Sequence, residues 1–216
     1  MDCHCDTFVF DLDGTLLDTL PDLVALTNRA LRDAGFPERT EQEILSYVGN
    51  GVRALMYQAV PEGTDSAQAE AAMDRWRELY PEYGTTLTKP YDGMVEVLAS
   101  LKEQGKKLAV LSNKFDGGVQ ELMPVFFPDV FDAAHGESAS IPRKPDPTGL
   151  LLTLEQIDAD PETTAYVGDS GGDMKTAHNA GVFAIGVSWG YRPEGELREM
   201  GADAIVHHPA ELLDFA

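Results

Sequence analysis

The stretch FVFDLDGTL, residues 8–16, decides how this chain folds, because it places two carboxylates directly after a buried strand. Residues 7–10 are β-branched or aromatic, which predicts a short core strand, and Gly14 predicts the turn that ends it. In an open parallel sheet, ligands bind beyond the carboxyl ends of the strands. Asp11 and Asp13 would face such a pocket, where a carboxylate can bind Mg²⁺, act as a nucleophile or transfer protons. The same pattern also fits a solvated turn, in which Asp and Gly are favoured for backbone reasons.

Two further apolar runs end in polar side chains, as the first one does. Residues 107–111 (KLAVL) are followed by residues 112–114 (SNK), whose small hydroxyl and amide groups suit phosphate oxygens. Residues 164–167 (TAYV) lead into residues 168–173 (GDSGGD), which place two more carboxylates where a helix begins. Carboxylates therefore recur where the predicted strands end.

A positive charge precedes the third of these strands. Residues 143–147 (RKPDP) contain Lys144, whose ammonium is a compact point charge on a long flexible stem. Its position just upstream of the strand lets it reach the acidic side chains. Together with four carboxylates it would form a site for a divalent cation and a phosphate, and those four belong to Asp11, Asp13, Asp169 and Asp173.

In this order, the four segments resemble the haloacid dehalogenase superfamily of phosphatases, and most nearly its phosphoglycolate phosphatases. Asp-x-Asp-Gly-Thr, a strand ending in Ser-Asn, an isolated Lys before Pro-Asp-Pro, and Gly-Asp-x-x-x-Asp are each weak patterns, but their ordered conjunction is specific. The resemblance covers nearly the whole chain. It implies a Mg²⁺-dependent phosphomonoester hydrolase that acts on a small phosphorylated metabolite, with 2-phosphoglycolate as the favoured substrate.

The resemblance assigns the chemistry to the first motif. Asp11 would be the nucleophile, and Asp13 the general acid and base. A carboxylate that attacks a dianionic phosphate meets like-charge repulsion, which Mg²⁺ and Lys144 would cancel. Attack by Asp11 would give an aspartyl-phosphate, while Asp13 protonates the leaving alkoxide and later takes a proton from the hydrolytic water.

The resemblance also assigns the groups that bind phosphate and metal. Ser112 and Lys144 would hold the phosphate, and Asn113 and Lys114, which flank the serine, are candidates to help. Asp173 would act on the metal through another ligand or a water molecule. The implied metal ligands are the Asp11 carboxylate, the Asp13 backbone carbonyl and the Asp169 carboxylate.

A helical insertion separates the first two strands. Apolar residues at helical spacing fill this interval, with a capping-box pattern at residues 40–43 and a glycine break at residues 49–51. Residues 17–84 are therefore expected to form an all-helical unit, which the resemblance identifies as a mobile cap. Residues 1–16 and 85–216 would form the catalytic α/β core.

Arg53 follows the glycine break of this insertion. A charge-assisted contact from its guanidinium to a substrate carboxylate would fit the resemblance to phosphoglycolate phosphatases. A solvated helix arginine fits the position equally well. Arg53 is therefore a candidate for substrate binding in the cap.

Strand and helix patterns alternate regularly after the insertion. Such repetition demands a parallel sheet with right-handed crossovers. The expected fold class is α/β, with a parallel-sheet Rossmann-like core and an inserted all-helical cap domain. Beyond the first strand, the predicted strands lie near residues 107–111, 131–134, 164–167, 183–187 and 204–206.

Composition limits the partners and the compartment. An apolar fraction of 43% in 216 residues permits a hydrophobic core. No stretch approaches the ~20 apolar residues that span a bilayer, and no secretory leader pattern opens the chain, which favours a cytoplasmic enzyme without a membrane partner. The net charge of −21 argues against a nucleic-acid partner, because polyanions repel one another. Oligomeric state is left open.

The two cysteines, Cys3 and Cys5, are too few and too close together for a disulfide framework. A Cys-His-Cys metal grip would need a second cysteine pair to complete a structural zinc site, and none exists. A frayed N-terminus is therefore the expectation for this segment.

Several other activities fit parts of the pattern. A sugar-phosphate mutase would use the same aspartyl-phosphate but pass it to a second hydroxyl, and pyrophosphatase activity is a further alternative. Dehalogenation is disfavoured, because relatives that attack carbon lack the acid corresponding to Asp13. A non-enzymatic receiver module would also carry aspartates, a lysine and Mg²⁺, but it needs no helical insertion at residues 17–84.

Overall fold

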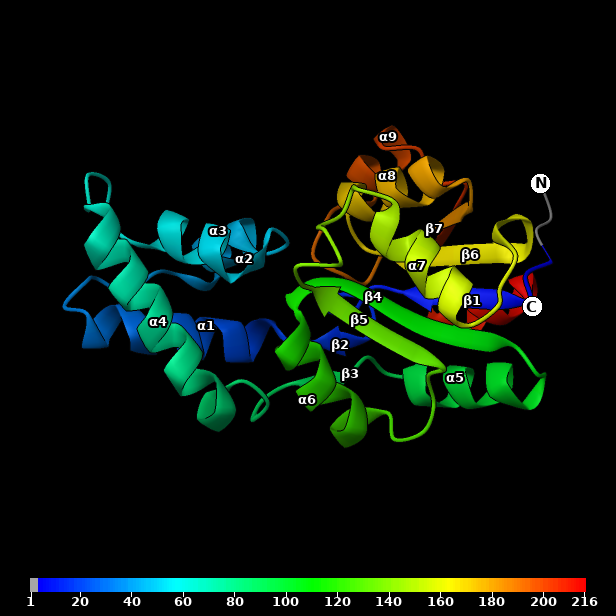
Figure 1. Ribbon diagram of the computed structural model, residues 1–216, viewed down its shortest axis with the longest axis horizontal. Helices are drawn as coiled ribbons and strands as arrows, with labels where there is room; N and C mark the ends of the chain where they lie inside the picture. Colours follow the sequence, from blue (N-terminus) through cyan, green and yellow to red (C-terminus); the bar gives the residue numbers. More distant parts are fainter. Residues whose placement is uncertain (1–3) are drawn as a thin grey trace. The chain divides into compact units, whose positions relative to one another are not determined.

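The computed structural model describes residues 4–216 and contains a parallel α/β sheet (Figure 1). Within these residues, six strands form the sheet in the order β5-β4-β1-β6-β7-β8, and the neighbouring strands are parallel. The predicted α/β fold class is thereby confirmed. The strands are β1 (Thr7–Phe10), β4 (Lys107–Phe115), β5 (Ala133–Glu137), β6 (Thr164–Gly168), β7 (Phe183–Val187) and β8 (Ala204–Val206).

The central strand is buried on both faces, as expected of a parallel sheet. Phe8 and Phe10 belong to a core shared with α5 and α6, whereas Val9 belongs to a second core shared with α7 and α8. Figure 1 shows these helices on opposite sides of the sheet. The helices of this unit are α5 (Met94–Glu103), α6 (Asp116–Phe126), α7 (Thr148–Gln156), α8 (Gly171–Ala180) and α9 (Glu194–Glu199), with 3₁₀ helices η1 (Pro161–Thr163) and η2 (Pro209–Phe215).

The chain divides into two compact units. Unit 1 holds the N-terminal residues to Leu17 together with Pro90–Ala216, and unit 2 is Asp18–Lys89. The division falls within two short paired strands, β2 (Leu17–Asp18) and β3 (Lys89–Pro90). The chain thus leaves unit 1 and returns to it through the same pair of strands.

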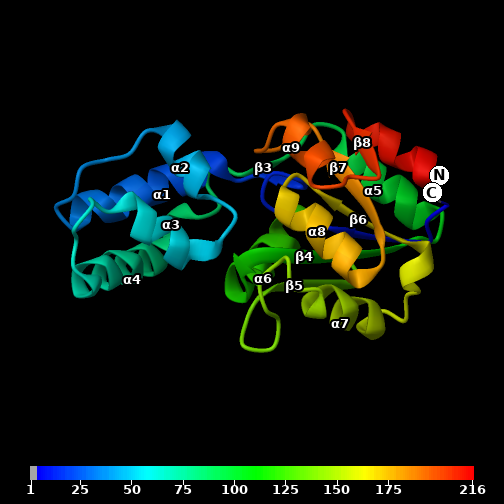
Figure 2. The same ribbon diagram turned by 90° about the horizontal axis from the view of Figure 1, so that it is seen from above.

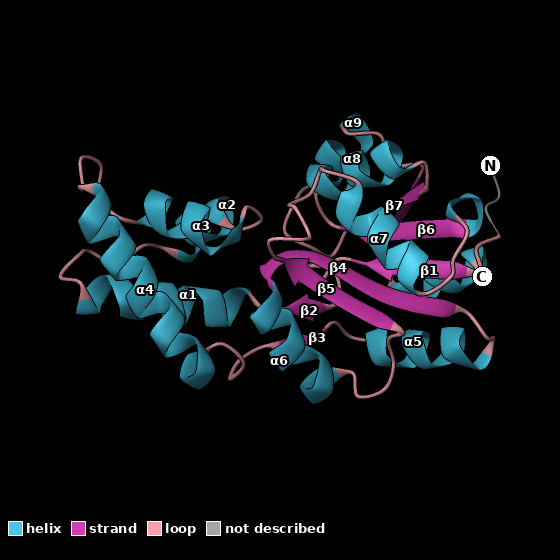
Figure 3. Cartoon of the chain, viewed as in Figure 1, coloured by secondary structure: helices cyan, strands magenta, loops and turns pink. Residues whose placement is uncertain are grey.

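Unit 2 is built of helices (Figure 3). Helices α1 and α4 pack against each other (Figure 2), and the Trp76 indole N–H donates a hydrogen bond of 3.2 Å to Thr27 Oγ1 between them. The predicted capping box is present, since Thr40 and Glu43 bond to each other's backbone N–H. The helices are α1 (Leu20–Asp33), α2 (Glu41–Tyr47), α3 (Gly51–Ala59) and α4 (Ser66–Tyr83).

Asp22 explains why the return segment after α4 belongs to unit 2. Its buried carboxylate accepts hydrogen bonds from the backbone N–H groups of Leu87 and Thr88 and from the Thr88 hydroxyl, the last at 2.6 Å. These bonds tie residues 87–88 to the first turn of α1. The sequence suggests a boundary at residue 85, where the helical pattern stops, but the structure places the return to unit 1 at Pro90.

Strand β4 is longer than the sequence predicts. The apolar run ends at Leu111, yet extended backbone continues to Phe115. The register with β5 shifts between these two residues, which marks an irregularity of the kind that redirects side chains near functional sites. Residues 112–114 therefore lie in the strand itself, not in the loop beyond it.

The expectation of a frayed N-terminus is wrong at Cys5. This residue is fully buried in the core, and its backbone N–H donates to the Phe215 carbonyl at 2.7 Å. The bond anchors the entry to β1 against η2. Cys3 lies outside the described residues. Among residues 4–216, no helix is both long and apolar enough to cross a membrane.

Candidate active site

Asp11 lies directly beyond β1 and is largely buried. Its Oδ1 accepts a hydrogen bond from the Leu12 backbone N–H at 2.7 Å and lies 2.8 Å from Lys144 Nζ. The pKa of Asp11 is raised from 3.8 to about 7, chiefly by burial; the Lys144 ammonium opposes this shift, and the negative charge of Asp173 adds to it. The carboxylate is thus held in place in an environment that disfavours its negative charge.

Lys144 lies between two carboxylates. Its Nζ is 2.8 Å from Asp11 Oδ1 and 2.6 Å from Asp173 Oδ1, and it lies over the Tyr166 ring, 5.6 Å from the centroid. Burial acts to lower the pKa of Lys144, but the charges of Asp11 and Asp173 outweigh burial and raise it well above 10.5. The ammonium is therefore a permanent positive charge beside Asp11.

Asn113 holds the backbone of Lys144. The amide Oδ1 of Asn113 accepts the Lys144 N–H at 2.7 Å, and its Nδ2 donates to the Lys144 carbonyl at 3.4 Å. One side chain thereby grips both polar groups of the lysine's main chain. These contacts give Asn113 a role in positioning Lys144, and its help in binding phosphate remains a prediction.

Asp173 is completely buried in the first turn of α8. Its Oδ2 accepts hydrogen bonds from the backbone N–H and the hydroxyl of Ser170, at 2.9 and 2.6 Å, while its Oδ1 faces Lys144. Ser170 and Asp173 form a capping box, so the carboxylate also starts the helix. Because both oxygens already have donors, Asp173 is better suited to holding Lys144 than to direct metal coordination.

Asp169 lies at the end of β6 and is held by residues from two loops. Its Oδ2 accepts the Tyr191 backbone N–H at 2.7 Å, and its Oδ1 lies 3.5 Å from the Thr15 hydroxyl. Glycines make this approach possible: a Cβ built on Gly14 would lie 2.4 Å from Asp169 Oδ2, and one on Gly190 would lie 2.2 Å from Asp169 Cβ. Any larger side chain at either glycine would displace the carboxylate.

The aspartates form a cluster suited to a hard cation. Carboxylate oxygens of Asp11, Asp169 and Asp173 lie within 4.8 Å of one another, and all three residues are buried. Burial, followed by the charges of Asp173 and Asp11, raises the pKa of Asp169 well above 3.8. Oxygen ligands in a buried site with unbalanced negative charge fit Mg²⁺. Asp11 and Asp169 are the side chains that would hold the ion.

We expect Mg²⁺ to stabilise the protein more at pH 8 than at pH 6. A proton on Asp11, whose pKa is about 7, competes with the ion, so the affinity rises with pH through 7 and then levels off. One displaced proton corresponds to at most about a tenfold rise per pH unit. The measurement is the Mg²⁺-induced increase in Tm at the two pH values, with NaCl of matched ionic strength as the control. An equal or larger increase at pH 6 would contradict the assignment.

Asp13 lies near a second buried lysine. Lys114 Nζ is 3.1 Å from Asp13 Oδ1, and the two side chains are only 5% and 16% exposed. The Lys114 backbone N–H in turn donates to Ser112 Oγ at 3.2 Å. Ser112 is itself buried at this end of β4. Lys114 thus contacts the predicted acid–base residue through its side chain and the predicted phosphate-binding serine through its backbone.

Arg53 lies on α3 in unit 2. Its guanidinium forms an ion pair with Glu70 at 2.5 Å, donates to the Tyr57 hydroxyl at 3.0 Å and stacks over the Tyr57 ring. Its side chain is 57% exposed. The predicted substrate contact would have to compete with Glu70 for the same charge.

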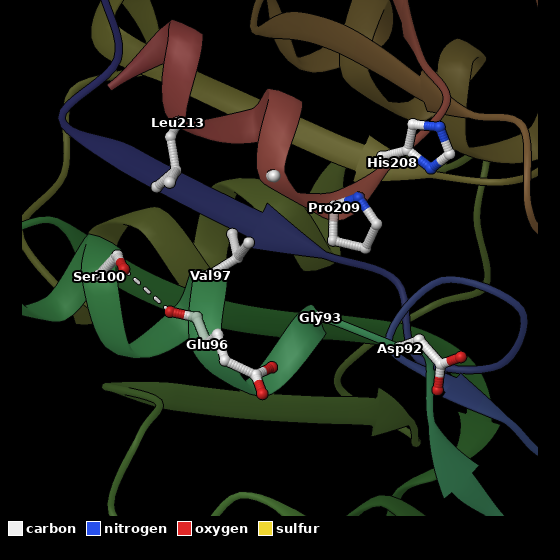
Figure 4. A pocket seen from close by; sticks show the side chains of 9 residues that line it. Asp92, Gly93, Glu96, Val97, Ser100, His208, Pro209 and Leu213 are labelled. Atoms are coloured by element: carbon white, nitrogen blue, oxygen red, sulfur yellow. Dashed lines mark hydrogen bonds between the residues drawn. The ribbon is translucent and has the colours of Figure 1, made fainter.

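A separate hollow of about 320 Å³ lies between α5 and η2 (Figure 4). Asp92, Glu96 and His208 lie around an apolar floor that includes Val97 and Leu213. Figure 4 shows the single hydrogen bond drawn within it, from a serine hydroxyl to the carbonyl one turn earlier in α5. None of the cluster aspartates lines this hollow, so it is distinct from the site described above.

Sequence reasoning missed or undervalued three contributors to the site. Lys114 follows Ser112 by two residues in an extended strand, and this spacing is the signal that both could serve the same pocket. Ser170 precedes Asp173 by three residues, which is a capping-box pattern. The support of Asp169 by the Tyr191 backbone has no local signal, because a main-chain donor can belong to any residue.

The chain belongs to the haloacid dehalogenase-like hydrolase family, whose model matches residues 8–187. It is a phosphatase of that family, as its relatives are. The chain is 34% identical over 217 residues to N-acetylmuramic acid 6-phosphate phosphatase of Pseudomonas aeruginosa, covering 95% of this chain and 92% of the relative. It is also 34% identical over 210 residues to phosphoglycolate phosphatase of Caulobacter vibrioides, covering 95% and 88%.

Solved structures show the same relationship. A Haemophilus somnus protein described as a predicted phosphoglycolate phosphatase superposes with a TM-score of 0.90 and 29% identity, over 97% of each chain. The resemblance to haloacid dehalogenase-type phosphatases inferred from the four motifs is thereby confirmed.

Proposed function

We propose that this phosphatase is a Mg²⁺-dependent phosphomonoester hydrolase that works through an aspartyl-phosphate on Asp11. The observation that carries the proposal is the buried set of Asp11, Lys144 and Asp173, with Asp169 close enough to share a cation. This set supplies a carboxylate nucleophile, a fixed positive charge and two ligands for a hard metal ion. Those are the parts that phosphoryl transfer to a carboxylate requires.

The residues divide the reaction as follows. Lys144 and the Ser112 hydroxyl bind phosphate oxygens and orient the phosphorus toward Asp11. The Asp11 and Asp169 carboxylates and the Asp13 backbone carbonyl would hold a Mg²⁺ ion. When bound, this ion would neutralise charge on the phosphate and on the attacking carboxylate. Asp173 and Asn113 keep Lys144 in place through its side chain and its backbone, respectively.

Asp13 is proposed as the general acid and base. It donates a proton to the ester oxygen of the leaving group as Asp11 attacks, so the alcohol departs neutral. In the second step it accepts a proton from the water that attacks the aspartyl-phosphate. Its side chain is only slightly exposed beside Lys114, which limits competing contact with bulk water.

The proposed substrate is a small phosphorylated metabolite, with 2-phosphoglycolate favoured. Similarity to phosphoglycolate phosphatases of several bacteria supports this choice. N-acetylmuramic acid 6-phosphate is a second candidate, because the relative that hydrolyses it is equally identical to this chain. Phosphate transfer to a second hydroxyl, as in a mutase, and pyrophosphate hydrolysis are the remaining alternatives.

Phosphate release from a panel of compounds tests the proposal. We expect an aryl phosphate and 2-phosphoglycolate to be hydrolysed only when Mg²⁺ is present, and Ca²⁺ to inhibit because its looser coordination disturbs the attack geometry. N-acetylmuramic acid 6-phosphate and pyrophosphate complete the panel, and glucose 1-phosphate is checked for isomerisation. Undiminished rates after chelation and dialysis would contradict the metal's role, while isomerisation without phosphate release would identify a mutase.

A further inference from the structure

Lys114 is a buried cation to which the proposed reaction assigns no role. Its ammonium is 3.1 Å from Asp13 Oδ1, in a site that already contains Lys144. The charge of Lys144 is paired with the carboxylates of Asp11 and Asp173, which flank it. Burial of an ammonium is unfavourable unless it is paired, and Lys114 is paired with Asp13, the residue that the proposed reaction uses for proton transfer.

The backbone around Lys114 is held firmly. Its N–H donates to Ser112 Oγ at 3.2 Å, and a Cβ built on Gly136 of β5 would lie 2.5 Å from the Lys114 carbonyl oxygen. Gly136 is itself anchored, because its N–H donates to Asp116 Oδ1 at 2.9 Å. The ammonium is therefore placed by a packed strand and does not depend on a mobile surface loop.

Geometry relates Lys114 to the leaving group. Under the proposed function, Asp13 must come within about 2.6–3.2 Å of the ester oxygen to donate its proton. Since Lys114 Nζ lies 3.1 Å from Asp13 Oδ1, it lies within about 6 Å of an ester oxygen to which Oδ1 donates. An anionic group two bonds from the ester oxygen would fall within reach of the ammonium, which has three donor hydrogens to share.

The balance of charges in the site also places Lys114 on the leaving-group side of the substrate. The site holds the carboxylates of Asp11, Asp13, Asp169 and Asp173, and a phosphate dianion adds two further negative charges, which a bound Mg²⁺ and the Lys144 ammonium would offset only in part. A substrate carboxylate next to the ester would add another, in a buried region where repulsion is weakly screened. Lys114 supplies the compensating charge on the leaving-group side, whereas Lys144 lies beside Asp11.

We propose that Lys114 determines specificity by binding an anionic group close to the ester oxygen of the substrate. This inference rests on the proposed function of Asp13 and narrows the substrate class to phosphate esters of small hydroxy acids, of which 2-phosphoglycolate is the simplest. Sugar phosphates whose carboxylate lies many bonds from the phosphate gain nothing from this contact. Arg53, in unit 2, is the rival carboxylate-binding residue.

A matched pair of substrates tests the proposal. Ethyl phosphate differs from 2-phosphoglycolate only in carrying a methyl group where the latter has a carboxylate. The quantity measured is the ratio of kcat/KM for 2-phosphoglycolate to that for ethyl phosphate, in the full-length Mg²⁺-loaded enzyme. Lys114→Met lowers both values, because Asp13 loses its partner, but it lowers the ratio by about tenfold or more, the value of a charge-assisted contact.

The controls separate specificity from structure. Lys114→Gln removes the charge but keeps a polar end group, so it replaces the methionine variant if that variant does not fold. We expect it to lower the kcat/KM ratio by the same factor. Lys175→Met, which removes an exposed lysine of α8, leaves the ratio unchanged. Arg53→Met tests the rival residue.

Four outcomes would overturn the proposal. Equal losses for both esters would reduce Lys114 to a positioning residue for Asp13. If this kcat/KM ratio falls in Arg53→Met and keeps its wild-type value in Lys114→Met, the carboxylate-binding residue is Arg53. A wild-type enzyme that releases phosphate from both esters with equal kcat/KM would overturn the specificity while leaving the hydrolase intact. Absence of release from either ester, and from an aryl phosphate, would overturn the hydrolase and this proposal with it.

Discussion

Asp11→Asn abolishes turnover and prevents formation of the covalent intermediate. The amide keeps the shape of the carboxylate and an oxygen that can accept the Leu12 N–H, but it cannot act as a nucleophile toward phosphorus. Loss of a covalent nucleophile costs on the order of 10⁴–10⁶ in kcat. Single-turnover kinetics with an aryl phosphate gives the size of the loss. Reductive trapping of the wild-type intermediate, followed by peptide mass analysis, should label Asp11.

The control for this variant is Asp74→Asn. Asp74 is an exposed residue of α4 in a surface ion pair, so the same chemical change there leaves turnover unaffected. Thermal unfolding shows whether either variant is less stable than the wild type. A label on Asp13 or Asp169, or turnover by Asp11→Asn close to that of the wild type, would contradict the assignment of the nucleophile.

Lys144→Met lowers kcat/KM by about 10²–10³, the usual effect of removing one fixed electrostatic donor from an active site. It also destabilises the fold by about 3–5 kcal/mol, because it leaves the buried charges of Asp11 and Asp173 without their shared cation. The substrate phosphate also loses its fixed positive charge. The measurements are kcat/KM with an aryl phosphate and the midpoint of urea unfolding. The control is Lys175→Met, which makes the same substitution at an exposed lysine of α8.

A double variant separates the two effects of Lys144. Adding Asp173→Asn removes one uncompensated buried charge, while the amide oxygen can still accept the Ser170 hydrogen bonds. We therefore expect stability to recover in part, since neighbouring sites are not additive. Activity stays low, because the phosphate still lacks a cation. Recovery of activity together with stability would mean that Lys144 acts only through folding.

The elements that the sequence predicted well are those with a local physical cause. Phe8, Val9 and Phe10 form an unbroken apolar run because a central parallel strand is buried on both faces, and the structure divides them between two cores. The capping box at residues 40–43 was readable because its donors and acceptors lie within one turn. The family resemblance rested on the order of four short motifs and is confirmed.

The contacts that the sequence could not predict join residues far apart in the chain. Lys114 and Asp13 are 101 positions apart, and Asn113 and Lys144 are 31 apart. Their side-chain directions depend on the irregular pairing of β4 with β5, which no local pattern reveals. The contact of the Asn113 amide with the Lys144 backbone is therefore visible only in the structure, and phosphate binding by Asn113 remains a prediction.

Arg53 illustrates the same limit within unit 2. The sequence shows a cation after a glycine break, but Glu70 and Tyr57 come beside it only when α3 and α4 pack together. Whether a charge is available depends on such partners. Arg53 as a carboxylate ligand is the alternative to Lys114, and the kcat/KM ratios of the two methionine variants decide between them.

By itself, the sequence determined the α/β core, the helical insertion and the presence of polar side chains at the ends of three strands, two of which carry carboxylates, because strand burial and helix capping are set by residues close together in the chain. Tertiary structure alone decided which charges meet. Parallel pairing of β1 with β4 and β6 brings Asp11, Asp13 and Asp169 to one edge of the sheet, and the two lysines reach them from segments far along the chain. The physical reason is that electrostatic interactions depend on distance and burial, which a linear sequence does not contain.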